Sequence, residues 1–469
     1  MATSEQKPPG FEAFEDKMRR AHVGDATIRA FQHSYRHLVA GGTGFVPETS
    51  IDPVLDLPHL EAIPADHQAS LSLVSQTVIL KLNGGLGTSM GLDRAKSLLL
   101  LRDGLTFLDF AVKQIQHLRS AVGVPPRFLL MNSFTTSRDT LEFLAKYPEL
   151  GESRSLELMQ SQVPKVDATS FGPVSWPANP TLEWCPPGHG DIYPSLLSSG
   201  LLERLLAEGR RYLFVSNSDN LGASLDLTLL SFFAQSGQDF IMEVAERTPS
   251  DRKGGHLARR NGRFMLRESA QCPESDLGAF QDIHRHRFFN TNNLWIRLDS
   301  MRAAIAAGGG FIPLPTIQNR KTVDPRDKNS PPVFQLETAL GAAIECFPKA
   351  GAIVVPRTRF APVKTTSDLL ALRSDAYAVT PDWRVVLASG PTGTPPAIRL
   401  DPNHYQQVDQ LDEKLRGVPS LRNCEELAVQ GSVLFESGTV FRGKLKITNR
   451  HPTLRPLPAG DYEDCSIEL

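Results

Sequence analysis

The stretch LNGGLGTSMGLDRAKS, residues 82–97, follows an apolar run and determines how the rest of the chain is interpreted. Four glycines fall in its first ten residues, and Lys96 comes just after them. Glycine lets backbone N–H groups approach a phosphate with no Cβ in the way, and it tolerates positive φ. A strand followed by such a loop is therefore a candidate cradle for a nucleotide.

Two familiar nucleotide loops do not match this stretch. A Walker P-loop requires Lys-Ser/Thr directly after its last glycine, whereas Gly91 is followed by Leu92 and Asp93, and Lys96 comes later. The dinucleotide fingerprint G-x-G-x-x-G is matched only loosely, because Met90 stands where its last glycine is expected. A glycine-rich connecting turn is the alternative at this point, because a lone glycine loop is weak evidence.

Composition limits the class of protein. A chain of 469 residues with 41% apolar and 22% charged residues can bury a large core and divides into two or three domains. A net charge of -2 leaves no basic field for nucleic acid or anionic lipid, and the basic stretch HLARR is short. No apolar run reaches the roughly 18 residues of a membrane helix. The charge and the short apolar runs therefore predict no nucleic-acid or membrane partner. The five cysteines form no C-x-x-C pair, so we expect a cytoplasmic protein.

Short apolar runs alternate with helical patterns from residue 77 onward, which predicts an α/β domain with a mostly parallel sheet. Strands are expected over 77–82, 128–131, 212–215, 240–244 and 352–355. Helices are expected over 107–118, 138–145, 196–207, 225–234, 336–344 and from 367 to 372, the last with Ser367 as a candidate N-cap. Before them, residues 11–40 predict one or two amphipathic helices that end at Gly41-Gly42.

Three parts follow from this pattern: an N-terminal helical segment (1–70), an α/β domain (71–388) and a C-terminal part (389–469). The turn-rich stretch SGPTGTPP, residues 389–396, marks the second boundary. Beyond it lie a charged helical stretch at 406–415 and short alternating runs over 427–448, separated by glycines. Short strands with glycine corners predict a small β-solenoid or sandwich.

Six motifs occur in order between about residues 78 and 372, and a weaker one, LAVQGSVLF, follows in the C-terminal part. They are LNGGLGTSMG…KS, PPGHGDIYPSLLSSGLL, FVSNSDNLGA, RTPSDRKGG, FNTNNLW and PRTRFAPVKTTSDLL. Together they resemble the eukaryotic-type UTP–glucose-1-phosphate uridylyltransferases, also called UDP-glucose pyrophosphorylases. The resemblance implies a Rossmann-like nucleotidyltransferase (GT-A-like) domain with a mixed, mostly parallel sheet, followed by a small left-handed β-helix domain.

The same resemblance implies a reaction: reversible, Mg²⁺-dependent transfer of the uridylyl group of UTP to glucose 1-phosphate, giving UDP-glucose and pyrophosphate. The attacking phosphate is already anionic, so the site must align two anions and neutralise their charge, without a general base. The lysines, amides and glycines of the motifs meet that demand.

The resemblance also implies a role for individual residues. The nucleotide is held by Leu82, Asn83, Gly84, Gly85, Gln160, Gly188 and Asp219, and the phosphates by the lysines Lys96 and Lys364, which are the catalytic pair. The sugar phosphate is contacted by Gly84, Gly85, His189, Asn217, Ser218, Asp219, Lys253 and Asn292.

Asp219 is the candidate metal ligand on chemical grounds as well. The run at 212–215 reads as a buried strand that leads into Asn217, Ser218 and Asp219, and open α/β sheets bind ligands at the carboxyl ends of their strands. A carboxylate there suits Mg²⁺, which keeps waters and bridges phosphate oxygens. The alternative is that Asp219 caps the helix expected near Leu225.

Other functions stay open at this stage. A relative could act on another sugar phosphate, as UDP-sugar and UDP-N-acetylhexosamine pyrophosphorylases do, or the chain could bind nucleotide sugars without turning them over. Lys96, Asp219 and Lys364 together argue against a mere binding protein. The sequence does not decide between a monomer and a homo-oligomer assembled through the C-terminal domain.

Overall fold

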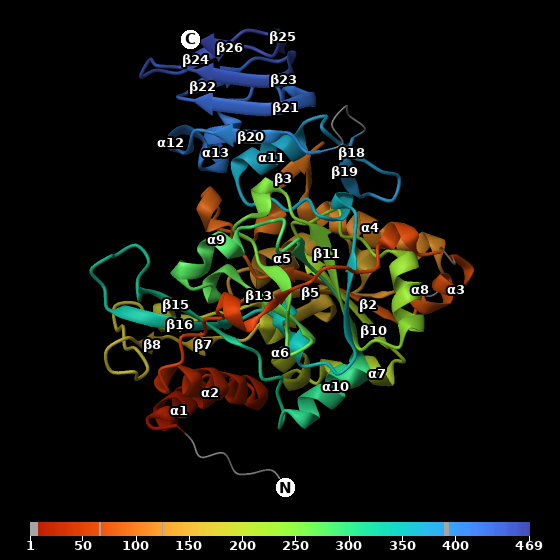
Figure 1. The fold of residues 1–469 in the computed structure, drawn as a ribbon, viewed down its shortest axis with the longest axis vertical. Coiled ribbons are helices and arrows are strands. Elements are labelled where there is room, and N and C mark those ends of the chain that lie inside the picture. The colour runs from red at the N-terminus through yellow and green to blue at the C-terminus, as the bar shows by residue number, and fades with distance from the viewer. Residues whose placement is uncertain (1–7, 65–66, 124, 389–393) are drawn as a thin grey trace.

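The computed structural model describes residues 8–64, 67–123, 125–388 and 394–469. Its centre is a ten-stranded sheet (Figure 1). Its strands are β1 (Asp52–Pro53), β2 (Thr77–Asn83), β5 (Arg127–Asn132), β6 (Glu157–Met159), β10 (Tyr212–Asn217), β11 (Phe240–Glu246), β12 (His256–Arg260), β13 (Arg263–Arg267), β14 (Phe288–Arg297) and β17 (Ala350–Val354). The order is β1-β12-β14-β10-β2-β5-β6, with β13 beside β12, and β11 paired with both β14 and β17.

Helices cover both faces of this sheet, as the alternation of side chains along β2 requires. Val78 and Leu80 pack into an apolar cluster with α6, α7 and α10, whereas Ile79 packs with α3, α4, α5 and α8 on the other face. These helices are α3 (His67–Val74), α4 (Phe107–Ala121), α5 (Ser137–Leu144), α6 (Ile192–Ser198), α7 (Leu201–Ala207), α8 (Leu227–Ser236) and α10 (Leu298–Ala307). The predicted α/β layering is confirmed.

The expected mixed sheet is confirmed, and most of its strands run in one direction, although fewer than half of its strand pairs are parallel. Four of the nine strand pairs described in this sheet are parallel, and all of β14's pairings, with β10, β11 and β12, are antiparallel. The apolar runs predicted the strands but not their direction, because a buried strand has the same apolar pattern whether its neighbours are parallel or antiparallel. The sheet is therefore mixed, with its parallel strands β10, β2, β5 and β6 side by side.

Most predicted elements are confirmed, within a few residues. The strands expected at 77–82, 128–131, 212–215, 240–244 and 352–355 are β2, β5, β10, β11 and β17. The expected helix at 196–207 is two helices, α6 and α7, because Gly200 between them takes a left-handed conformation with φ of 67°.

The helix expected over 336–344 is wrong. The first part belongs to β16 (Pro332–Thr338), which pairs with β15 (Thr316–Thr322) so that Leu336 lies opposite Gln318. A 3₁₀ helix, Leu340–Glu345, follows. The apolar residues have helical spacing, but the backbone of this segment bonds to distant parts of the chain. For example, Thr338 N–H donates to Pro187 O at 2.9 Å.

The helix expected to begin near Ser367 is α11 (Thr366–Arg373), but Ser367 is not its N-cap. Thr365 caps it in a capping box, in which the Thr365 hydroxyl accepts from Asp368 N–H and the Asp368 carboxylate accepts from Thr365 N–H. Ser367 Oγ accepts a hydrogen bond from Leu400 N–H at 3.3 Å instead.

The N-terminal prediction resolves into two helices, α1 (Phe11–Arg20) and α2 (Asp25–Val39). Their aromatic residues pack with Val163, Cys185 and Leu336 of the α/β part. Figure 1 shows these helices and the C-terminal strands at opposite ends of the molecule.

The C-terminal strands are β20 (Ala397–Leu400), β21 (Ser420–Gln430), β22 (Val433–Phe435), β23 (Thr439–Thr448), β24 (Arg455–Leu457), β25 (Gly460–Glu463) and β26 (Ser466–Glu468). Every pairing described among them is parallel, which does not fit an antiparallel sandwich. Two short helices, α12 (Pro402–Tyr405) and α13 (Val408–Asp412), stand near the predicted charged stretch. Residues 389–393 of the predicted boundary lie outside the described residues, so the domain limits stay a prediction.

The remaining elements are short. They are β3 (Leu100–Arg102), β4 (Leu105–Thr106), β7 (Val163–Pro164), β8 (Val166–Asp167), β9 (Trp184–Cys185), β18 (Tyr377–Val379), β19 (Val385–Leu387) and α9 (Leu277–Phe280). The five cysteines are free thiols. Among the described helices, none combines the length and the apolar character that crossing a membrane requires.

Candidate active site

The carboxyl ends of the parallel strands β10, β2 and β5 meet at one edge of the sheet. Leu82 lies opposite Asn217, and Asn83 lies opposite Asn132. Ser218 N–H also donates to Leu82 O at 3.0 Å, which joins the loops that follow β2 and β10. A cleft of about 340 Å³ opens at this edge, lined by Leu82, Gly84, Gly85, Lys96, Met131, Gln160, Pro186, Gly188, His189, Asn217, Ser218 and Asp219.

The glycine loop folds back on itself after β2, and this return explains the position of Lys96. Lys96 N–H donates to Gly85 O at 3.0 Å, so the lysine lies beside the glycines despite the residues between them. A Cβ on Gly84 would lie 2.9 Å from Gln160 Oε1, whereas nothing stands within 4 Å of one on Gly85. The backbone at Gly85 is therefore open to the cleft.

Lys96 and Asp219 contact each other directly. Lys96 Nζ lies 2.6 Å from Asp219 Oδ2, and the two side chains are 18% and 14% exposed. Lys96 Nζ also donates to the carbonyl of Val363. One ammonium group therefore joins the glycine loop, the loop after β10 and the segment that carries Lys364.

Asp219 does not cap the following helix. Asp226 is the N-cap of α8, and its carboxylate accepts from Leu229 N–H at 3.0 Å. Asp219 therefore keeps its carboxylate in the cleft, as a metal ligand requires.

Gln160 and Gly188 form the far wall of the cleft. Gln160 Nε2 donates to Gly188 O at 2.8 Å. Gly188 has a φ of 81°, and a Cβ there would lie 2.5 Å from Thr338 O. This wall admits only glycine at position 188, because both the conformation and the space require it.

His189 presents a neutral ring to the cleft. Burial lowers the pKa of His189 to about 4. Its Nδ1 accepts a hydrogen bond from Leu340 N–H at 2.8 Å, so the ring proton lies on Nε2. His189 can therefore donate one hydrogen bond at neutral pH and carries no charge.

Asn292 lies next to the cleft through Asn217. Its Nδ2 donates to Asn217 Oδ1 at 2.9 Å. Its Oδ1 is buried without a hydrogen-bond partner in the part of the chain that the structure describes. Its φ of 60° is left-handed, a conformation that asparagine adopts more readily than most residues, and β11 is irregular opposite this part of β14. An orphaned acceptor beside a cleft is what a ligand hydroxyl would satisfy.

Besides Asn292, three predicted residues do not line the cleft. The Asn83 side chain is buried behind it, where Nδ2 donates to Asn132 Oδ1 at 2.7 Å and to Thr140 Oγ1 at 2.9 Å. A role for Asn83 in nucleotide binding therefore falls to its backbone. Lys253 and Lys364 are both exposed. Lys364 nevertheless follows Val363, the partner of Lys96.

Sequence reasoning missed three residues of this region. Met131 and Pro186 line the cleft, and the position of Met131 at the end of β5 could have indicated it. Glu268 was missed without any sequence signal. A Cβ on Gly255 would lie 2.5 Å from Glu268 Oε2, so this carboxyl lies against the segment just after Lys253, a predicted sugar-phosphate contact. Burial raises the pKa of Glu268, and the charge of Lys364 opposes the shift.

The surroundings of Asp219 suit a Mg²⁺ ion that takes one carboxylate from the protein and its other ligands mainly from substrate and water. No group of three or more His, Cys, Asp or Glu side chains suited to a metal occurs among the described residues. Mg²⁺ in phosphate-transfer sites is commonly held by one or two carboxylates together with substrate phosphates and waters. A single carboxylate in a cleft with backbone N–H groups and a lysine matches that arrangement.

Known proteins resemble the chain over most of its length. A family model described as UTP–glucose-1-phosphate uridylyltransferase matches residues 29–442. A curated relative of that name from Solanum tuberosum is 39% identical over 414 residues, 87% of this chain and 84% of the relative. One from Saccharomyces cerevisiae is 40% identical over 379 residues, 81% of this chain and 75% of the relative.

Solved structures agree in fold and sequence. A mutant UDP-glucose pyrophosphorylase from Leishmania major, in complex with UDP-glucose, superposes with a TM-score of 0.95 at 46% identity, over 99% of this chain and 100% of that one. A UDP-glucose phosphorylase from Trypanosoma brucei gives 0.91 at 47% identity, over 98% and 100%.

Proposed function

The chain belongs to the UTP–glucose-1-phosphate uridylyltransferase family, and on that premise we propose that it converts UTP and α-D-glucose 1-phosphate to UDP-glucose and pyrophosphate. One observation carries the proposal beyond family membership. The glycine loop, Lys96, Asp219 and the Gln160–Gly188 wall line a single cleft. That cleft offers backbone donors, a cation and a carboxylate to two phosphorylated substrates.

In the proposed reaction, an oxygen of the sugar phosphate attacks the α-phosphorus of UTP. A P–O bond forms there, and the bond to the β-phosphate oxygen breaks to release pyrophosphate. Reversal is the same exchange with pyrophosphate as the attacking group. The attacking oxygen carries no proton that must be removed, so positioning and charge neutralisation supply the catalysis.

Leu82, Gly84 and Gly85 bind the nucleotide through the backbone, with Asn83 limited to its backbone as well. Gln160 and Gly188 hold the nucleotide from the opposite wall, and Gln160 does so with an amide already fixed by Gly188 O. Lys96 neutralises the phosphates from beside the loop. Lys364 directly follows Val363, whose carbonyl accepts from Lys96. We propose that Lys364 supplies the second positive charge to the phosphates.

The sugar phosphate lies on the side of the cleft formed by His189, Asn217, Ser218 and Asn292, in this proposal. The His189 Nε2–H donates to it without adding charge. The orphaned Asn292 Oδ1 accepts from a sugar hydroxyl. Lys253, at the turn above Glu268, completes the set of sugar contacts.

Mg²⁺, when bound, neutralises charge on the phosphate oxygens, and we assign Asp219 as the residue that holds it. For the C-terminal part we propose a left-handed β-helix, supported by its purely parallel strand pairs. Any homo-oligomer would form through this part. We also place the protein in the cytoplasm, a proposal that its five free thiols support.

A coupled assay of pyrophosphate release tests the proposal. The purified chain is given UTP, Mg²⁺ and, in separate reactions, the 1-phosphates of glucose, galactose and N-acetylglucosamine. We expect turnover with glucose 1-phosphate that exceeds the others. If none of the three sugar phosphates is turned over, the proposed enzyme activity is refuted. A preference for N-acetylglucosamine 1-phosphate would refute the assignment of glucose as the sugar.

A further inference from the structure

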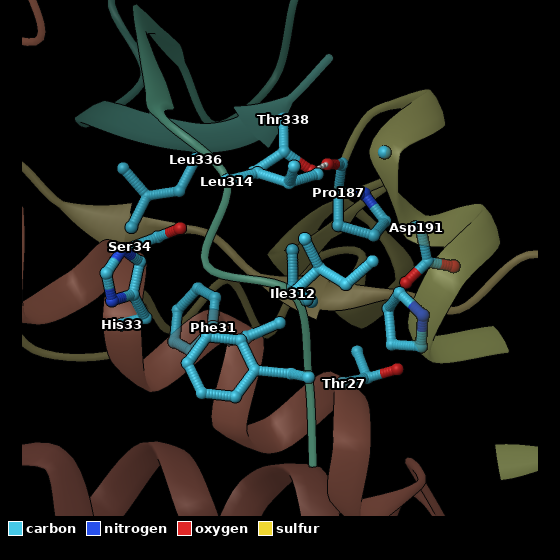
Figure 2. A pocket seen from close by; sticks show the side chains of 15 residues that line it. Thr27, Phe31, His33, Ser34, Pro187, Asp191, Ile312, Leu314, Leu336 and Thr338 are labelled. Carbon is cyan, nitrogen blue, oxygen red and sulfur yellow. Dashed lines mark hydrogen bonds between the residues drawn. The ribbon is translucent and has the colours of Figure 1, made fainter. Parts of the chain in front are cut away.

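A small cavity lies behind the far wall of the cleft, between that wall and helix α2 (Figure 2). Its volume of about 30 Å³ has room for about two water molecules. Apolar side chains such as Phe31, Ile312 and Leu336 make up much of the lining. Asp191 brings a carboxyl group to it from the segment that also carries Gly188 and His189.

The two oxygens of the Asp191 carboxyl have different surroundings. Asp191 is only 2% exposed. Oδ2 accepts hydrogen bonds from Ser161 N–H at 2.7 Å and from the Ser195 hydroxyl at 2.6 Å. Oδ1 is buried and has no hydrogen-bond partner within the described parts of the chain. Burial raises the pKa of Asp191 to about 7, so a proton on Oδ1 or a water in the cavity fits this oxygen.

Two hydrogen bonds join the Gln160–Ser161 segment to the Gly188–Asp191 segment, and the one from Ser161 to Asp191 is the first. Ser161 follows Gln160, whose Nε2 donates to Gly188 O at 2.8 Å on the cleft side. Gly188 in turn precedes Asp191 by three residues. The two chain segments are therefore held together twice, by Gln160 in front and by Asp191 behind.

The N-terminal helices cover this arrangement from behind. Thr27 Oγ1 of α2 lies 2.9 Å from Ser161 Oγ, within hydrogen-bond distance. Figure 2 shows Thr27 and Asp191 facing the same cavity from α2 and from the segment before α6. His33 of α2 is the other titratable residue in the lining.

We propose that Asp191 is a positioning residue for the nucleotide: its carboxyl fixes the Gln160–Ser161 segment against the Gly188–Asp191 segment, and so sets the shape of the nucleotide wall. This inference rests on the proposed function. It concerns the nucleotide more than the sugar phosphate, because the His189 ring is held separately by Leu340 N–H.

Two substitutions at Asp191 separate positioning from packing. Asp191→Asn keeps a carbonyl oxygen that accepts from Ser161 N–H and Ser195, and its amide group can donate to water in the cavity. Asp191→Leu keeps the branched shape in a larger side chain but removes both acceptors. We expect Asp191→Leu to raise the KM for UTP at least tenfold with less than a threefold change in the KM for glucose 1-phosphate, and Asp191→Asn to stay within threefold of wild type for both.

Ile312→Val is the matched control, since it alters the same cavity from a loop that carries no predicted site residue. We expect it to lower the melting temperature slightly and to leave both KM values unchanged. If Asp191→Leu does not fold, Ser195→Ala serves in its place, since it removes one of the two donors to Oδ2. A two- to fivefold rise in the KM for UTP is then expected.

The outcomes distinguish this inference from the proposed function. A wild-type chain without uridylyltransferase activity refutes the proposed function. An active wild type overturns the inference under any of three results: Asp191→Leu, or Ser195→Ala in its place, leaves the KM for UTP unchanged; both KM values rise equally; or Asp191→Asn is as impaired as Asp191→Leu.

Discussion

Lys96 and Asp219 form an ion pair across the cleft, with Nζ 2.6 Å from Oδ2. The proposed reaction requires each of them to meet a different partner, a phosphate for the lysine and Mg²⁺ for the carboxylate. In this structure the two charges compensate each other. In the proposed reaction, substrate binding would exchange this contact for two new ones.

Lys96→Met tests this exchange, because it removes the cation that would compete with Mg²⁺ for the Asp219 carboxylate. We expect kcat to fall about 100-fold, as for loss of one charge-stabilising donor. We also expect Mn²⁺, as a probe for Mg²⁺, to bind the nucleotide-free variant several-fold more tightly, measured by electron paramagnetic resonance. Lys364→Met is the control and leaves Mn²⁺ binding as in wild type. Equal Mn²⁺ affinity in Lys96→Met and wild type would show that Lys96 does not restrain the carboxylate.

Asp219→Asn keeps the shape of the side chain and removes the charge that we propose holds the metal. We expect activity at saturating Mg²⁺ to fall at least 100-fold. Initial rates over a range of MgCl₂ concentrations check this. Wild-type activity at ordinary Mg²⁺ would place the metal on other groups.

Lys364→Ala removes the exposed lysine beyond Val363. If Lys364 reaches the phosphates only as charge is transferred, kcat falls 100- to 1000-fold while the KM for glucose 1-phosphate changes less than threefold. Steady-state kinetics with each substrate varied in turn separate the two effects. An unchanged kcat would remove Lys364 from the catalytic pair.

Arg359 and Glu243 form a buried ion pair behind the cleft. Nε and Nη2 of Arg359 each donate to one Glu243 oxygen at 2.8 Å, and the side chains are 3% and 0% exposed. Arg359→Met leaves the carboxylate buried without its cation, so we expect the free energy of unfolding in urea to fall by about 3–5 kcal/mol. The double variant Arg359→Met/Glu243→Met should recover only part of this loss, because the buried donors Asn293 Nδ2 and Trp295 Nε1 then lose the carboxylate that accepts from them. A fall below about 1 kcal/mol in the single variant would contradict the expectation.

The buried Asp191 predicts a pH dependence of stability. Its pKa rises from 3.8 when unfolded to about 7 when folded, so between these values the folded chain holds a proton that the unfolded chain has lost. Its contribution to stability is therefore lost as the pH rises from about 4 to about 7. Asp191→Asn has no such proton, so its unfolding free energy relative to wild type should increase by roughly 3 kcal/mol between pH 5 and pH 8. Urea unfolding at both pH values measures it, and a constant difference would show that Asp191 ionises normally.

The local elements of the fold could be predicted because they depend on local patterns. The apolar run of β2 and the glycines after it lie close together in sequence, and the rule that ligands bind at strand ends located Asp219. The direction of β14 and the strand at 332–338 could not be predicted in this way. Both depend on partners far along the chain, as in the pairing of Leu336 with Gln318.

The site divides in the same way. Lys96, Gly188 and Asp219 were predicted from their motifs, and the structure brings them to one cleft with Gln160. Which atoms remain free to bind is a tertiary property, so the engaged side chain of Asn83 and the orphaned Oδ1 of Asn292 have no signature in the sequence. The buried carboxyl of Asp191 belongs to this second group, since its motif does not reveal its burial.

The contact of Lys96 with the Val363 carbonyl also governs when the site can appear. These residues are 267 positions apart, so a ribosome must release most of the catalytic part before this contact can close. A nascent chain therefore carries its glycine loop long before the cleft is complete. Closing so large a ring is slow compared with forming local helices, which makes recovery of the cleft a late event in refolding.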